Sequence, residues 1–146
     1  MKAPVNTAVK ALIIVDHGSR LESANNMLQY VADLVRKAAP EGIIVDSAHM
    51  ELAEPTIEQV IDKCVENGAT EIIVHPYMLS PGRHATKDIP ELVFEAAKKH
   101  PDVKTCVTKP LGLDTKIAEV ILDRAGIGAQ KVAKKKEGFL KSVFNL

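Results

Sequence analysis

Two histidines follow separate apolar runs of the sequence. The run VKALIIVD (residues 9–16) is followed by His17 and Gly18, and the run EIIVH (71–75) leads into a Pro- and Gly-containing loop that carries His84. Neutral imidazole is a common ligand of divalent transition metals, and its titration near neutral pH also suits proton transfer. A neighbouring glycine permits a tight turn or a close approach of the backbone to a ligand. Both histidines are therefore candidates for metal binding or acid–base chemistry.

These residues can meet only if the apolar runs are neighbouring strands. Short runs of apolar, β-branched residues predict buried strands at 9–16, 43–49, 71–75 and 103–108. Apolar positions spaced by three and four predict helices at 24–39, 56–66, 89–100 and 114–125, with Ser23 as the cap of the first. The alternation predicts an α/β fold: a mostly parallel four-stranded sheet flanked by helices on both faces, as a three-layer sandwich.

Ligands of open α/β sheets bind beyond the carboxyl ends of the strands, and this rule collects the candidate site. His17, Glu51 and His84 follow three different strands, so they can converge without sharing a short motif. Imidazole and carboxylate together suit a divalent metal. His49 and His75 also lie at strand ends, where we expect backbone carbonyls to satisfy their rings. The cations at this edge, Arg20, Arg83 and Lys87, form either a solvated face or a site for carboxylates.

Composition narrows the classes of function. The 146 residues include 19 Lys+Arg and 19 Asp+Glu, and this balance argues against a nucleic-acid partner. No apolar run is long enough for a membrane span, and the first residues lack the apolar core of a secretory signal. We expect a cytoplasmic chain, with removal of an organellar transit peptide left open. Cys64 and Cys106 lack metal-binding spacing and are expected to be buried thiols.

The chain divides into three parts by composition. We expect an N-terminal extension at 1–8, one domain at 9–126 and a basic tail at 127–146. The domain carries no GxGxxG, no phosphate-binding GxxxxGK[ST] and no GxSxG nucleophile motif. Dinucleotide, P-loop and serine-hydrolase chemistry are therefore disfavoured.

Three stretches together resemble a known family. They are VDHGSR, MELAEPTIEQVIDKCVENGATEIIVHPYMLSPGRHATKDIPEL and KPLGLD. Together they resemble the sirohydrochlorin chelatases, the class II chelatases called CbiX or SirB. The resemblance covers residues 9–125 and is most specific in the pairing of HGS with GRHxxxDIP. It implies the flavodoxin-like chelatase sandwich and insertion of Fe²⁺ or Co²⁺ into sirohydrochlorin, for sirohaem or cobalamin. A related archaeal group uses Ni²⁺. The metal is a substrate, and no tightly bound cofactor is implied.

The resemblance also assigns roles to residues. It implies that His17 and His84 bind the metal and that Glu51 assists them in catalysis. From their chemistry and their place at this edge, we expect Gly18, Ser19, Arg20, Arg83 and Lys87 to contact the tetrapyrrole. Lys87 stands where many members carry a second loop histidine, and a lysine suits a substrate carboxylate better than a metal. The single-domain length resembles the short form of the family, which implies a homodimer.

Two other functions are alternatives to a chelatase. A metal or tetrapyrrole carrier without turnover would need the same ligands, and only product yield per chain separates it from an enzyme. A flavodoxin-like FMN protein is disfavoured, because the loop after the first strand lacks a Ser/Thr-rich phosphate cradle.

Overall fold

Four parallel strands form the centre of the first of two structural units. The computed structural model describes residues 7–128, so the predicted parts at 1–8 and 127–146 lie almost entirely outside the described residues. The first unit extends to Gly112 and the second begins at Leu113. The first contains β1 (Lys10–Asp16), α1 (Glu22–Ala38), β2 (Ile44–His49), α2 (Ile57–Glu66), β3 (Glu71–Pro76), η1 (His84–Asp88), α3 (Ile89–Ala97) and β4 (Lys104–Val107).

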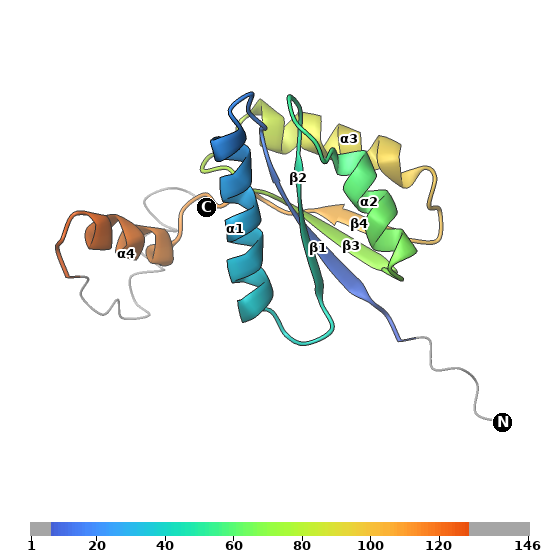
Figure 1. Ribbon diagram of the computed structural model, residues 1–146, viewed down its shortest axis with the longest axis horizontal. Helices are drawn as coiled ribbons and strands as arrows, with labels where there is room; N and C mark the ends of the chain where they lie inside the picture. Colours follow the sequence, from blue (N-terminus) through green and yellow to red (C-terminus); the bar gives the residue numbers. More distant parts are fainter. Residues whose placement is uncertain (1–6, 129–146) are drawn as a thin grey trace. The chain divides into compact units, whose positions relative to one another are not determined.

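The sheet has the strand order β2-β1-β3-β4, and every pair is parallel. Successive side chains of β1 point to opposite faces, as the pleat requires. Ile13 and Val15 pack with α2 and α3, whereas Ile14 packs with Leu28 and Ala32 of α1. Figure 1 shows α1 on one side of the sheet and α2 and α3 on the other. The predicted three-layer α/β sandwich is therefore confirmed.

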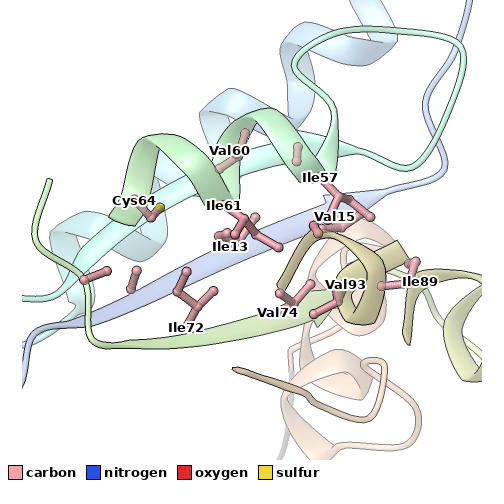
Figure 2. Close-up of a cluster of buried hydrophobic side chains, with 14 of the residues drawn as sticks. Ile13, Val15, Ile57, Val60, Ile61, Cys64, Ile72, Val74, Ile89 and Val93 are labelled. Carbon is pink, nitrogen blue, oxygen red and sulfur yellow. The ribbon is translucent and has the colours of Figure 1, made fainter. Parts of the chain in front are cut away.

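The larger core lies between the sheet and α2 and α3 (Figure 2). Ile61 of α2 and Ile72 of β3 are fully buried there, and Cys64 packs beside them. Burial raises the pKa of the Cys64 thiol to about 11. Cys106, on edge strand β4, is exposed, so the expectation of two buried thiols is wrong for this residue. An edge strand with little covering it leaves even an apolar position open to solvent.

Helix starts differ from the sequence expectation at α1. The helix begins at Glu22, and its N-cap is Leu21 without a side-chain hydrogen bond. Ser23 therefore lies inside the first turn rather than at the cap. Thr56 does cap α2, in a reciprocal capping box with Gln59. This box fixes the chain where it leaves the loop that carries Glu51.

The loop predicted between β3 and α3 is helical in its last part. η1 is a π-helical turn, closed by the Ile89 N–H donating to the His84 carbonyl five residues earlier. It runs directly into α3, and Pro90 is tolerated because it lies in that helix's first turn. The helical start places His84 on a rigid element rather than on a free loop.

The second unit contains α4 (Thr115–Arg124). Asp114 caps this helix by accepting a hydrogen bond from the Lys116 N–H. Within residues 7–128, no helix combines the length and apolar character that a membrane crossing requires.

Candidate metal and tetrapyrrole site

His17 is the first residue after β1. Its Nδ1 lies 3.1 Å from the carbonyl oxygen of Gly18, an acceptor, so Nδ1 carries the hydrogen. Its Nε2 lies 3.0 Å from Oε1 of Glu51. Nε2 faces the Glu51 carboxylate, so a metal bound to this nitrogen would replace the contact with Oε1. The side chain is about half-exposed, so an incoming ion can reach it.

His84 is the first residue of η1 and meets a different partner. Its Nδ1 lies 2.7 Å from Oδ2 of Asp88, one π-helical turn later. Donation of the Nδ1 hydrogen to this carboxylate leaves Nε2 as the ligand atom. Carboxylate partners of this kind orient metal-binding histidines and raise their basicity. Asp88 therefore holds His84 in a form suited to a metal.

The two imidazoles meet, although they are 67 positions apart in the chain. Their ring centroids are 4.8 Å apart, and the rings cross at 73° in an edge-on arrangement. The loop after β1 and the helical turn before α3 reach the same place because both follow the carboxyl ends of adjacent strands. The structure therefore brings together His17, His84 and Glu51, as the sequence predicts.

Glu51 is brought to His17 by the loop that follows β2. The Glu51 N–H donates to the His17 carbonyl at 3.1 Å, and the Met50 N–H donates to the Asp16 carbonyl at 2.9 Å. Gly18 has a φ of +90°, and a Cβ there would overlap the carbonyl oxygen of Glu51. Gly18 is thus needed for a close approach between two loops of the chain itself.

Ser19 organises the loop between β1 and α1. Its hydroxyl accepts a hydrogen bond from the Leu21 N–H. Its backbone N–H and carbonyl both bond to the side-chain amide of Asn25. These contacts hold the loop next to His17, and the hydroxyl hydrogen remains available to a ligand.

The three predicted cations are exposed, as a carboxylate-binding role requires. Arg20 follows the loop of His17. Arg83 immediately precedes η1, and Lys87 lies within it. Nε of Arg83 is 3.9 Å from Oδ1 of Asp88, so this guanidinium lies near the partner of His84. Arg83 is therefore next to the site.

An acidic pocket adjoins the two histidines. It encloses about 380 Å³ and is lined by Met50, Glu51, Asp88, Glu91, Leu92 and Glu95. Glu51 and Asp88 are also the carboxylates that contact His17 and His84. The sequence reasoning missed Glu91 and Glu95 of α3, although they follow Asp88 of η1 at the helical spacing of three and four. That spacing was the available signal.

The two other histidines at strand ends, His49 and His75, hydrogen-bond to side chains, whereas the sequence predicts backbone carbonyls as their partners. His49 Nδ1 lies 2.6 Å from Asp16 Oδ1, so a carboxylate and not a backbone carbonyl satisfies it. His75 Nδ1 lies 2.7 Å from the hydroxyl of Thr108. Burial lowers the pKa of His75, and a backbone hydrogen bond with Lys109 opposes the shift. The strand pairing sets both partners, and it could not be derived from local sequence.

His100 belongs to a separate network at the other end of the molecule's strands. Its Nε2 lies 2.6 Å from Oδ1 of Asp62, and Lys99 also contacts that carboxylate. Hydrogen bonds from Lys99 and then His100 lower the pKa of Asp62. This network joins the end of α3 to α2. Over the described residues, no group of three or more His, Cys, Asp or Glu side chains is arranged to hold a metal ion.

Comparisons with known proteins identify the family of the chain. Residues 11–126 match the CbiX family. The chain is 42% identical to the chloroplastic sirohydrochlorin ferrochelatase of Arabidopsis thaliana, over 77% of this chain and 50% of that protein. It is 34% identical to a sirohydrochlorin cobaltochelatase of Methanococcus maripaludis, over 80% of this chain and 98% of that protein.

A solved structure shares the fold. The crystal structure of SirB from Bacillus subtilis subspecies spizizenii, in complex with cobalt, superposes with a TM-score of 0.74 at 31% identity, over 80% of this chain and 50% of that chain. The chain thus spans half the length of SirB and of the Arabidopsis relative, and nearly all of the Methanococcus relative. Since the family match covers most of the sequence and both structural and sequence relatives agree, the chain belongs to the CbiX family.

Proposed function

We propose that this chain is a sirohydrochlorin chelatase, which inserts Fe²⁺ or Co²⁺ into sirohydrochlorin in sirohaem or cobalamin biosynthesis. The observation that carries the proposal is the pair of half-exposed imidazoles, His17 and His84, with ring centroids 4.8 Å apart. Two relatives that the chain resembles are named ferrochelatase and cobaltochelatase of sirohydrochlorin. A structural relative has been solved with cobalt.

In this proposal, His17 and His84 hold the incoming metal through their Nε2 atoms. The Gly18 carbonyl and the Asp88 carboxylate accept the Nδ1 hydrogens, so Nε2 is the ligand atom of each ring. At His17 the metal takes the place of the contact with Glu51. Two imidazoles leave further coordination positions to water and to the pyrrole nitrogens of the substrate. Such an open site suits a metal that must be passed on rather than retained.

Proton removal is assigned to Glu51. The metal replaces two pyrrole N–H hydrogens, so each turnover consumes one M²⁺ and one free tetrapyrrole and releases the metallated ring and two protons. Oε1 of Glu51 is 3.0 Å from Nε2 of His17, beside the ligand atom of the metal. A carboxylate in this place can accept a proton from a pyrrole nitrogen as the metal is transferred.

The tetrapyrrole is proposed to lie over the edge that carries both histidines. Its peripheral carboxylates suit the exposed cations Arg20, Arg83 and Lys87. Gly18 and Ser19 provide a narrow loop beside His17. We further propose a homodimer, in which two copies of the short chain associate; the chain covers half of its longer relatives. A cytoplasmic location stays a prediction, tested by imaging the tagged chain in its own cell.

Multiple-turnover assays test the proposal. Purified protein is mixed without oxygen with excess sirohydrochlorin and either Fe²⁺ or Co²⁺, and the absorbance change of the ring is followed. We expect many metallated products per chain above the uncatalysed rate. Removing a ligand should cost at least about 100-fold in rate in His17→Ala and His84→Ala. His100→Ala, which removes a histidine of the distant network, should keep the wild-type rate. A yield limited to one product per chain would identify a carrier instead.

A further inference from the structure

A histidine–carboxylate pair, with the histidine buried, lies at the strand ends that lead into the proposed metal site. His49 and Asp16 are the last residues of β2 and β1 and are partners in the strand register. His49 Nδ1 is 2.6 Å from Asp16 Oδ1, and the exposed fractions of the two side chains are 4% and 22%. The two strands are thus joined by a short, charge-assisted hydrogen bond where their backbone ladder ends.

The pair stands at the base of the two loops that carry His17 and Glu51. Each loop leaves its strand immediately after the pair, and backbone hydrogen bonds from Met50 and Glu51 continue the contact for two more residues. A Cβ on Gly18 would come within 3.3 Å of the His49 Cβ, so the loop of His17 also packs on His49 itself. Any change in the separation of the strand ends is therefore transmitted to the His17–Glu51 contact.

His49 is also anchored on its other side. Its backbone N–H donates to the Pro55 carbonyl at 2.9 Å, and it forms an isolated bridge with Thr56, the cap of α2. The loop that carries Glu51 thus begins and ends at His49. The residue fixes both ends of this loop.

We propose that His49 and Asp16 are positioning residues, whose hydrogen bond sets the placement of the ligand His17, and of Glu51 against it, and thereby the affinity of the site for a divalent metal. The inference rests on the proposed function for its effect on turnover. The effect on metal affinity concerns the free protein and is tested without the tetrapyrrole.

Amide substitutions separate the hydrogen bond from the bulk of the ring. In His49→Asn the amide nitrogen takes nearly the position of Nδ1 and can still donate to Asp16. In His49→Gln the amide nitrogen lies nearer the position of Nε2 and does not reach Asp16. The matched control is His100→Ala, because the His100–Asp62 pair has the same 2.6 Å separation but lies away from the site.

Cobalt titration by calorimetry, together with thermal unfolding, tests the proposal. We expect His49→Gln to weaken Co²⁺ binding about tenfold, by analogy with outer-shell substitutions at metal sites, and His49→Asn to stay near the wild-type affinity. His100→Ala should lower the unfolding temperature without changing the affinity. Equal affinities of the two His49 variants would overturn the proposal. So would an affinity loss in His100→Ala, or failure of both His49 variants to fold while His100→Ala folds, since these results indicate a role in stability alone.

Insertion assays on the same variants keep the two proposals apart. If the wild-type protein binds Co²⁺ but gives no turnover, the chelatase proposal fails while the Asn–Gln comparison still decides the role of His49. If turnover is normal and the two amide variants bind Co²⁺ equally, the positioning proposal alone fails.

Discussion

The two imidazoles of the site differ in what holds their Nδ1 atoms. His17 lies beside a backbone carbonyl, whereas His84 lies beside the carboxylate of Asp88. Both kinds of partner fix the orientation of a metal-binding ring. His17, which also contacts Glu51, is the histidine closer to the proposed proton acceptor.

Glu51→Gln tests the division between binding and proton transfer. Gln keeps the shape of the side chain and its contact with His17, but it cannot accept a proton. We expect kcat to fall by about 10²–10⁴-fold, the usual contribution of a general base. The Kd for Co²⁺, measured by titration, should change by less than about tenfold. A larger loss of affinity than of kcat would make Glu51 a metal ligand instead.

His75 gives the stability of the protein a pH dependence. Burial lowers the pKa of His75 below the ordinary value of 6.5. Between these two pKa values the ring is protonated in the unfolded state and neutral in the folded state. Its contribution is therefore fully present above pH 6.5 and is lost as the pH falls through the lower, folded-state pKa. His75→Asn removes the titrating ring and keeps a donor near Thr108. We expect urea unfolding from about pH 7 to about pH 5 to show a smaller loss of stability in this variant. An equal loss in both proteins contradicts the assignment.

At the scale of elements, the edge of the sheet was predictable and its finer contacts were not. Periodicity located the four strands and their helices, and the strand-end rule then brought His17 and His84 together. The π-helical turn of η1 was missed because Pro81 and Gly82 indicate a loop, although the following Ala85 and Lys87 favour a helix. The pairing of His49 with Asp16 depends on the register of β1 and β2, which local sequence does not encode.

The crossing of two loops at Gly18 yields a prediction at this scale. In Gly18→Ala the new Cβ meets the Glu51 carbonyl, and a φ of +90° is itself unfavourable for alanine. We expect a loss of at least about 1 kcal/mol in the free energy of unfolding, together with weaker Co²⁺ binding as the loop of Glu51 is displaced.

Gly82→Ala is the matched control for this prediction. Gly82 lies in the other loop of the site, and a Cβ there has no neighbour within 4 Å. This variant should bind Co²⁺ like the wild type. Wild-type stability and affinity in Gly18→Ala would show that the close approach of the two loops is not required.

At the scale of the whole molecule, the proposed homodimer predicts the mass of the assembly. The chain corresponds to half of the Arabidopsis protein and of SirB, but to nearly all of the Methanococcus protein. If two chains associate as a homodimer, sedimentation should give the mass of two chains at micromolar concentration. A mass of one chain under conditions of full activity would contradict the homodimer and leave the single module sufficient.

The account depends on His17 and His84 binding one metal ion together. A crystal structure of the protein grown with Co²⁺, with the ion located by its anomalous scattering, tests this directly. We predict one cobalt bound by Nε2 of both histidines, with Glu51 beside it and open positions filled by water. Cobalt bound elsewhere while both rings remain unliganded would contradict the central claim.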